Sequence, residues 1–225
     1  MARNFVSGSS QYLGNTTTPI TAYPVTMACW VRPETGSDMT VMSINDSGGN
    51  NDFWSLRISG VPETLEFRST QGGTAVVTDS GTVTDVTWNH VAAVGTSATS
   101  RTSYRDGANA STNTTSNTPT GLDRLGIGAR NSQTVAEYCT ARIAEAAIWN
   151  VALAAGEIAI LADGYSPLFV RPGSLVAYWP IIGRLSPEID VVGAYDMTVT
   201  GATQVAHTRI IYPAPLSYIP FAAAA

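Results

Sequence analysis

Apolar and polar residues alternate along most of this chain, which is the pattern of β-strands that bury one face. In the stretch 25–31, Val25, Met27, Cys29 and Val31 form one face of such a strand. The alternation predicts further strands at 40–44, 53–58, 65–69, 74–78 and 142–149, with a hairpin turn at Gly72-Gly73. The pattern is therefore that of an all-β protein.

Helical spacing stands out at one place, directly after the strand that ends at Trp149. Leu153, Ile158 and Leu161 recur as they would on one face of a helix. We expect a single short helix near 152–162, at the edge of an otherwise β-sheet protein.

Length and charge narrow the class of protein. A chain of 225 residues with 44% hydrophobic residues is long enough to form one all-β domain with a proper core. All 12 basic residues are Arg, the net charge is −5, and the Arg residues are scattered, so we expect no nucleic-acid partner. The N-terminal stretch has no apolar segment typical of a secretory signal, and no apolar run is long enough for membrane insertion. We therefore expect synthesis in the cytoplasm.

Several segments carry a family resemblance. The Trp149-Asn150 pair followed by the predicted helix resembles the closing motif of laminin-G-like, concanavalin A-like domains. The segments YPVTMACWVRP (23–33) and WNHVAAVGT (88–96) resemble two of that family's strands, and similar landmarks continue from 3 to 165. The resemblance implies a two-sheet antiparallel jelly-roll sandwich and implies no particular function.

The region after the helix is unexpected for that family. Residues 174–205 resemble the usual beginning of such a domain, although they lie near the end of this chain. We interpret residues 1–206 as one circularly permuted domain in which 174–205 supplies the terminal strands. The alternative is a strand swap, in which these strands complete a neighbouring copy.

The last segment, 207–225, is predicted to be an extended, Pro-rich arm. Such an apolar arm is expected to contact its own domain or a partner subunit. Its candidate assembly residues are Ile210, Ile211, Tyr212, Leu216, Tyr218 and Phe221.

A loop rich in Asp, Asn and Gly separates the strands at 40–44 and 53–58. Asp46, Asn50, Asn51 and Asp52 have side-chain oxygens that could bind Ca²⁺, although their spacing follows no EF-hand pattern and a solvated turn is the alternative. Trp54 and Tyr104 are candidate contacts for a glycan, should the protein bind one. No other cofactor is expected.

Catalysis is not expected. Glu188 and Asp190 match the first two carboxylates of the Glu-x-Asp-x-x-Glu motif in laminarinase-type hydrolases that share the fold, but the third is absent. His90 lies in a predicted core strand and is interpreted as structural. Cys29 and Cys139 are two isolated buried thiols or, alternatively, a pair between strands.

Two functional hypotheses follow. The first is a non-catalytic structural or adhesion protein of an assembly, most concretely a decoration protein of a phage virion, on its capsid or tail. Its expected partners are other protein subunits, either copies of itself in a homo-oligomer or a capsid or tail protein, and it would also bind surface glycans. The alternative is a stand-alone, lectin-like carbohydrate-binding module.

Overall fold

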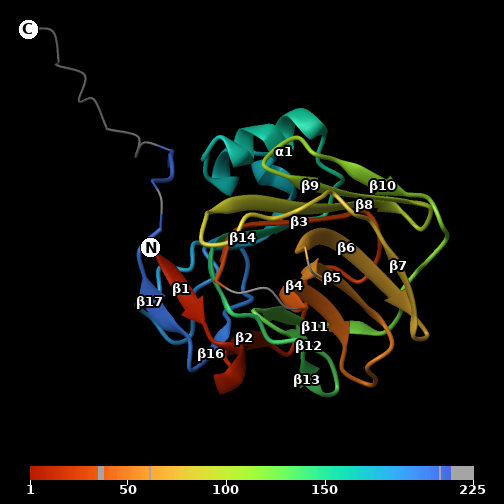
Figure 1. The fold of residues 1–225 in the computed structure, drawn as a ribbon, viewed down its shortest axis with the longest axis horizontal. Helices are drawn as coiled ribbons and strands as arrows, with labels where there is room; N and C mark the ends of the chain where they lie inside the picture. The colour runs from red at the N-terminus through yellow and green to blue at the C-terminus, as the bar shows by residue number, and fades with distance from the viewer. Residues whose placement is uncertain (35–37, 61, 208, 214–225) are drawn as a thin grey trace, which may run out of the picture.

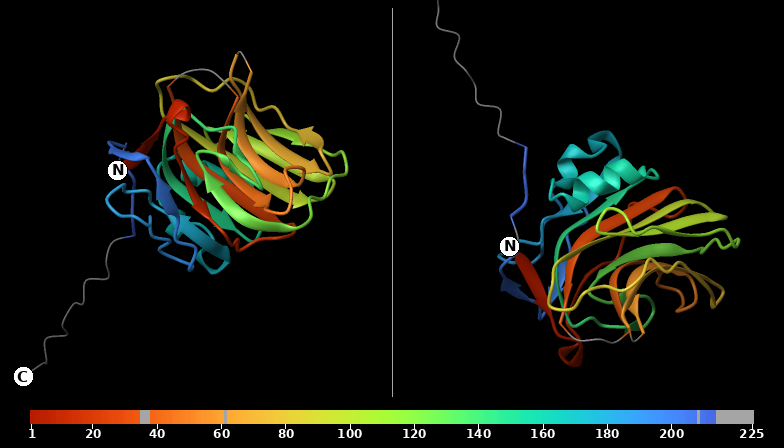
Figure 2. Two further views of the ribbon diagram at one scale, coloured as in Figure 1. Left: turned by 90° about the horizontal axis from the view of Figure 1, so that it is seen from below. Right: turned by 45° about the horizontal axis from the view of Figure 1, so that its top comes forward.

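Two antiparallel sheets pack face to face, and one helix covers the outside of one of them (Figure 1). The structure is a computed structural model that describes residues 1–34, 38–60, 62–207 and 209–213. The views in Figure 2 show the two sheets as separate layers of one sandwich. This architecture confirms the predicted all-β jelly-roll sandwich.

The sheet beneath the helix, sheet A, has the strand order β10-β9-β8-β3-β14-β1-β17, with β15 also paired to β14. Its strands are β1 (Ala2–Phe5), β3 (Val25–Pro33), β8 (Asn89–Ser97), β9 (Ser100–Arg105), β10 (Ser111–Asn113), β14 (Ala141–Trp149), β15 (Leu175–Trp179) and β17 (Thr203–Val205). Short 3₁₀ turns at Ser7–Ser9, Pro167–Phe169 and Pro172–Ser174 connect some of the elements.

The opposite sheet, sheet B, has the order β16-β2-β11-β4-β5-β6-β7. Its strands are β2 (Tyr12–Asn15), β4 (Met39–Asp46), β5 (Phe53–Ser59), β6 (Thr64–Gln71), β7 (Thr74–Val77), β11 (Leu122–Ile127) and β16 (Thr198–Thr200). A small hairpin of β12 (Arg130–Asn131) and β13 (Val135–Ala136) lies beside this sheet.

The main core fills the space between the two sheets. Leu56 and Phe67 reach it from sheet B, and Val91 and Trp179 reach it from sheet A, each with no exposed surface. The alternation in the sequence predicts these inward positions because successive side chains of a strand point to opposite faces.

A second apolar cluster lies on the outer face of sheet A, under α1 (Ala155–Ala162). Ala28, Ala92 and Ala147 form a shallow surface there, and Ile158 and Leu161 of the helix are buried in the same cluster. The predicted helix at 152–162 is thus confirmed, and its apolar face explains why it lies on this sheet.

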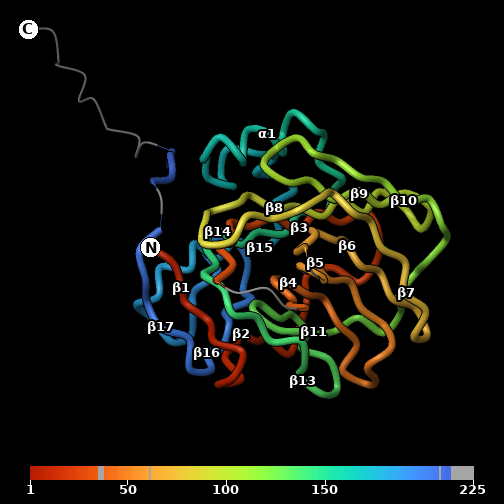
Figure 3. Tube along the Cα trace, in the orientation of Figure 1, coloured from red at the N-terminus to blue at the C-terminus, as the bar shows by residue number. Residues whose placement is uncertain are grey.

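The late strands complete the chain's own sheets. β15 pairs with β14, β16 with β2, and β17 with β1 (Figure 3). A buried ion pair between Arg3 Nε and Glu188 Oε2, 2.7 Å long, ties the segment before β16 to the first strand. That these strands were moved by circular permutation stays a prediction.

Two smaller features complete the description of the fold. The polar stretch between β9 and β11 contains β10, because Ser111 to Asn113 pair with β9. Cys29 and Cys139 are separate, buried thiols, and burial raises the pKa of both. In the described part of the chain, we find no helix with the length and hydropathy needed to cross a membrane.

Candidate functional site

The outer face of sheet B is polar across all but its last strand. One row of directly paired residues crosses all seven strands and contains only small or polar side chains until it reaches the last strand. In spatial order the row is Thr198, Gly14, Gly126, Ser43, Ser55, Arg68 and Val77. Since these positions alternate with core residues, the strands turn their polar side chains to one surface.

The segment 128–139, which includes the β12–β13 hairpin, crosses this polar face. Two glycines let it lie directly on the sheet. A Cβ atom on Gly126 would meet the Ala129 carbonyl at 2.5 Å, and one on Gly14 would meet Asn131 Nδ2 at 3.1 Å. Ser43 Oγ donates a hydrogen bond to the Ala129 carbonyl (2.9 Å), which fixes the crossing point. The hairpin therefore divides the face into two parts.

On one side of the hairpin lies a groove of about 290 Å³. It is lined by Tyr12, Asn15, Thr16, Arg124, Asn131, Val135, Thr198 and Thr200, together with Gly14. Its aromatic wall is the half-buried ring of Tyr12, which packs edge-on against Tyr138 at a centroid distance of 6.1 Å. Asn131 is buried, and its Nδ2 donates to the Leu125 carbonyl at 2.7 Å. The groove thus combines a positioned ring with amide, guanidinium and hydroxyl groups.

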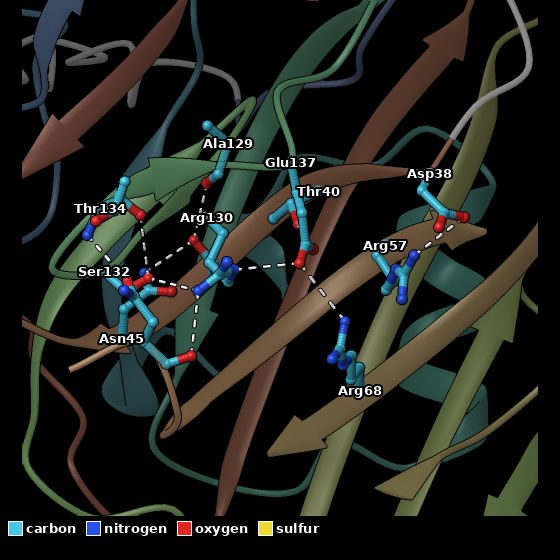
Figure 4. Close-up of polar contacts among 12 residues, drawn as sticks. Asp38, Thr40, Asn45, Arg57, Arg68, Ala129, Arg130, Ser132, Thr134 and Glu137 are labelled. Atoms are coloured by element: carbon cyan, nitrogen blue, oxygen red, sulfur yellow. Dashed lines mark hydrogen bonds and ion pairs between the residues drawn. The ribbon is translucent and has the colours of Figure 1, made fainter. Parts of the chain in front are cut away.

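On the other side lies a cluster of three arginines, which we call the guanidinium cluster: Arg57, Arg68 and Arg130, with their carboxylate partners (Figure 4). Glu137 Oε1 accepts from Arg130 Nε at 3.2 Å and lies 3.6 Å from Arg68 Nη1. The guanidinium groups of Arg68 and Arg130 lie 5.1 and 4.9 Å from the centroid of the Phe53 ring. The ring and the ion pairs together hold the arginines in place.

Burial of the charged groups in this cluster costs free energy, because they lose contact with water. Arg57 is 8% exposed and pairs with Glu66 at 3.6 Å and with Asp38 at 3.1 Å. Burial raises the pKa of Glu66 and lowers the pKa of Arg68, in both cases because the charged form loses contact with water.

Several polar atoms in and beside the cluster lack a hydrogen-bond partner in the part of the chain that the structure describes. They are Asn45 Oδ1, Ser55 Oγ, Arg57 Nε, Glu66 Oε2, Arg68 Nε and Thr70 Oγ1. Buried polar atoms are normally satisfied, often by ordered water, so we expect ordered water at these atoms.

The predicted Ca²⁺ loop lies at one end of sheet B and uses its oxygens to close the fold. Asp46 Oδ1 accepts from the Gly48 amide at 2.7 Å, and Asp52 accepts from the amides of Thr120 and Gly72 at 3.0 and 3.1 Å. Asn50 Oδ1 accepts from the Thr134 amide of the hairpin at 2.9 Å. Asn51 belongs to the same loop, and its carbonyl accepts from the Gly73 amide.

These contacts hold the loop in place, and Ca²⁺ binding by its oxygens stays a prediction. Within the described residues, no group of three or more His, Cys, Asp or Glu side chains is arranged to hold a metal ion.

The two predicted aromatic contacts lie elsewhere. Trp54 has no exposed surface and points into the main core, where its Nε1 donates to the Tyr23 hydroxyl at 3.0 Å. The interpretation of Trp54 as a glycan contact is therefore wrong, because alternation along β5 turns it inward. Tyr104 is half-buried against the cluster under α1, on the sheet opposite the polar face.

The carboxylates of the incomplete hydrolase motif have structural partners. Glu188 pairs with Arg3, and Asp190 Oδ1 accepts from the amides of Tyr178, Val192 and Gly193. His90 is buried as expected, but its Nδ1 has no hydrogen-bond partner among the described residues. Burial lowers the pKa of His90 to about 3.

Comparison with protein families gives a match over residues 7–159, which is more than half of the chain, to the concanavalin A-like lectin/glucanases superfamily. The chain belongs to this superfamily. A comparison with curated proteins found no match. The superfamily match stops before β15, so it leaves the origin of the late strands open.

Solved structures give the same lectin-like fold at low identity. A candidate carbohydrate binding protein from Bacteroides ovatus superposes with a TM-score of 0.60 and 19% identity, over 90% of this chain and 58% of that one. A Ruminococcus gnavus sialidase module, CBM40, bound to α2,3-sialyllactose gives 0.55 and 13%, over 63% and 84%. The tailspike protein 2 domain of bacteriophage CBA120 gives 0.55 and 15%, over 79% and 31%.

Sequence reasoning missed the residues of the polar face. The sequence did contain a signal for this face, namely polar residues at every second position of the central strands. Examples are Ser55 and Arg57 in β5, and Glu66 and Arg68 in β6. Alternation alone predicts that these polar residues face solvent. In the structure, however, Ser55 is fully buried and Arg57 almost fully.

Proposed function

We propose that this chain is a non-catalytic carbohydrate-binding protein whose ligand lies on the outer face of sheet B. The observation that carries the proposal is the 290 Å³ groove, in which the Tyr12 ring stands beside Arg124, Asn131 and the hydroxyls of Thr198 and Thr200. A sugar has an apolar C–H face, which packs on an aromatic ring, and hydroxyls, which pair with planar amides and guanidinium groups. The groove supplies both kinds of contact.

The guanidinium cluster beside the groove suits the same ligand class, because its arginines and their carboxylate partners Asp38, Glu66 and Glu137 bring donors and acceptors together. Hydroxyl groups both donate and accept, so a polyhydroxylated ligand suits this mixture better than a purely anionic one. The Bacteroides ovatus protein and the sialyllactose-bound module add support by analogy, since they share the fold.

The test is binding to an array of immobilised oligosaccharides by the full chain and by Tyr12→Ala and Arg124→Gln variants. We expect each variant to lose about tenfold in affinity, because packing on one aromatic ring contributes about 0.5–1.5 kcal/mol and a hydrogen bond to a charged group about 1.5–3 kcal/mol. Phe169→Ala is the matched control, because Phe169 is an exposed aromatic residue on another part of the molecule. Equal binding by all four proteins would overturn this site.

The absence of catalysis is part of the proposal. The two glutamates of the guanidinium cluster, Glu66 and Glu137, each form ion pairs with arginines, so we propose that they hold the cluster together rather than act as the acid and nucleophile of glycoside hydrolysis. We expect no release of reducing sugar from a bound glycan. Release that disappears in Glu66→Gln would contradict this.

We also propose that the protein works within an assembly, most concretely as a phage virion decoration. The supporting observation is the segment after the sandwich. Ile210 is half-buried, while Ile211 and Tyr212 remain 41% and 46% exposed although their backbone or hydroxyl groups contact the domain. Leu216, Tyr218 and Phe221 lie outside the described residues. Apolar surface of this kind is suited to a partner subunit.

Light scattering of the full chain beside a chain ending at 206 tests the assembly role. We expect the full chain to be oligomeric, or to join its particle, and the truncated chain to be a folded monomer. Monomers in both cases, together with undiminished incorporation of the truncated chain into the particle, would leave only the stand-alone binding module.

A further inference from the structure

A second hollow lies on the opposite side of the molecule, at the end of α1. It has a volume of about 440 Å³, and we call it the tryptophan groove. Its lining includes Trp30, Thr87, Trp88, Asp163, Gly164 and Arg209. None of these residues lines the groove on sheet B. Its volume lies within the range of about 300–1,000 Å³ that is usual for ligand sites.

A row of aromatic rings forms one wall. His207 packs edge-on against Trp88, at a centroid distance of 4.4 Å and an interplanar angle of 83°. Its distance to Trp30 is 6.1 Å, and Trp30 in turn lies 5.4 Å from His90. Edge-to-face packing fixes the orientation of both indoles, and each remains half-buried at the groove.

The rim carries two charged side chains, Asp163 and Arg209. Within the described residues, the carboxylate of Asp163 and the guanidinium of Arg209 make no hydrogen bond or ion pair. One acid and one base leave the rim neutral overall. Together with the indoles, they suit a neutral ligand that has an apolar face and several hydroxyl groups.

The end of the described chain builds the remaining wall. The Ile211 amide donates to the Gly164 carbonyl at 2.8 Å, and the Ser166 amide donates to the Ile211 carbonyl at 2.9 Å. The Tyr212 hydroxyl donates to Glu145 Oε1 at 2.6 Å. These three bonds hold the segment that carries Arg209 at the groove.

The anchor for this segment is an unusual residue. Glu145 is only 4% exposed, sits at a register shift of β14, and has a left-handed backbone with φ of 53°. Its other carboxylate oxygen accepts from the Tyr178 hydroxyl, and burial raises the pKa of Glu145. Left-handed non-glycine residues are costly and tend to occur where a side chain must be aimed, here at Tyr212.

We propose that the tryptophan groove is a second saccharide-binding site, specific for neutral sugars and completed by residues 209–212. The ligand class rests on the proposed function, whereas the site itself is separate from the sheet B face. Stacking on Trp30 and Trp88 would hold the ring of the sugar, and Asp163 and Arg209 would bind its hydroxyls.

Tryptophan fluorescence reports on this site selectively. Trp54, Trp149 and Trp179 have no exposed surface, so Trp30 and Trp88 are the indoles that a ligand can reach. The probes are a panel of neutral trisaccharides built from glucose, galactose, mannose and N-acetylglucosamine units, titrated into the full chain and into Tyr12→Ala, Trp88→Ala and Asp163→Asn variants. The same four proteins are applied to the oligosaccharide array.

We expect a fluorescence change in the full chain and in Tyr12→Ala, and its loss or an at least tenfold weaker response in Trp88→Ala and Asp163→Asn. Array binding lost only with Tyr12→Ala, without a fluorescence response, would overturn this inference and leave the sheet B site standing. Binding lost only with Trp88→Ala would support the groove and overturn the sheet B site.

Two other outcomes also decide the matter. No binding by the full chain in either assay would overturn both sites. An oligomer that dissociates on Trp88→Ala while no saccharide changes the fluorescence would assign the groove to a neighbouring copy and overturn saccharide binding there.

Discussion

The two sheets of the sandwich have outer faces of opposite character. On sheet A, the outward positions of β3, β8 and β14 include Ala28, Ala92 and Ala147, and α1 covers them. On sheet B, the outward positions of β4 and β5 include Ser43 and Ser55, and the β12–β13 hairpin covers them only in part. Both faces are largely buried, but one is buried by apolar packing and the other by polar contacts.

This difference has a consequence for function. Apolar packing is satisfied within the chain, so the surface under α1 has no capacity left for a ligand. A polar face that carries arginines, carboxylates and hydroxyls keeps hydrogen-bonding groups that a polar ligand can contact. We therefore propose binding on sheet B and at the margin of α1, where apolar packing ends.

The largest expected effect comes from Trp149→Ala, which breaks the packing under α1. Trp149 has no exposed surface, and its Nε1 donates to the Val170 carbonyl at 2.8 Å. We expect the free energy of unfolding in urea to fall by about 3–5 kcal/mol. Trp88→Ala, at a half-buried position, is the control and should cost less than ~1.5 kcal/mol. Equal losses in the two variants would show that the cluster under α1 is not a second core.

An intermediate effect is expected from acid, through His90. Its pKa is lowered to about 3 by burial, whereas the unfolded chain protonates near 6.5. Between these values the unfolded state binds the additional proton, so stability falls as the pH falls, by at most ~1.4 kcal/mol per pH unit. Urea unfolding at pH 7, 5.5 and 4.5 should show a smaller decline for His90→Gln than for the unchanged protein.

The titratable groups near His90 also affect how stability depends on pH, each in a predictable direction. Glu145 shares a small cavity with His90, and its raised pKa acts in the opposite direction, because its protonated form is favoured in the fold. The Asp106 carboxylate accepts a hydrogen bond from the His90 backbone amide, not from the imidazole. Burial lowers the pKa of His207 to about 4, so His207→Gln is a control with a smaller effect of the same sign. An unchanged pH dependence in His90→Gln would exclude His90 as the acid-sensitive group.

The sequence predicted most strands, because alternation shows which residues share one face of a strand. The position of Trp54 was predicted wrongly, because the pattern of a single strand does not say which of its two faces is the outer one. It also could not show that Gly14 and Gly126 would admit the hairpin, or that a register shift would aim Glu145 at Tyr212, since these contacts join segments far apart in the chain.

The smallest expected change in stability comes from two serines, Ser43 and Ser55, which are paired on neighbouring strands of sheet B. They also give the sharpest test of how the polar face is satisfied. Ser43 Oγ donates to the Ala129 carbonyl and accepts from Asn45 Nδ2, both at 2.9 Å, whereas Ser55 Oγ has no partner among the described residues.

Removing a bonded hydroxyl leaves its partners unsatisfied, so Ser43→Ala should cost ~1–3 kcal/mol. Removing the unsatisfied one relieves a desolvated group, so Ser55→Ala should change the free energy of unfolding by less than ~1 kcal/mol, and in the stabilising direction. Urea unfolding of both variants measures the difference. Equal destabilisation would mean that Ser55 already has a partner in the free protein, and that the polar face is satisfied before any ligand binds.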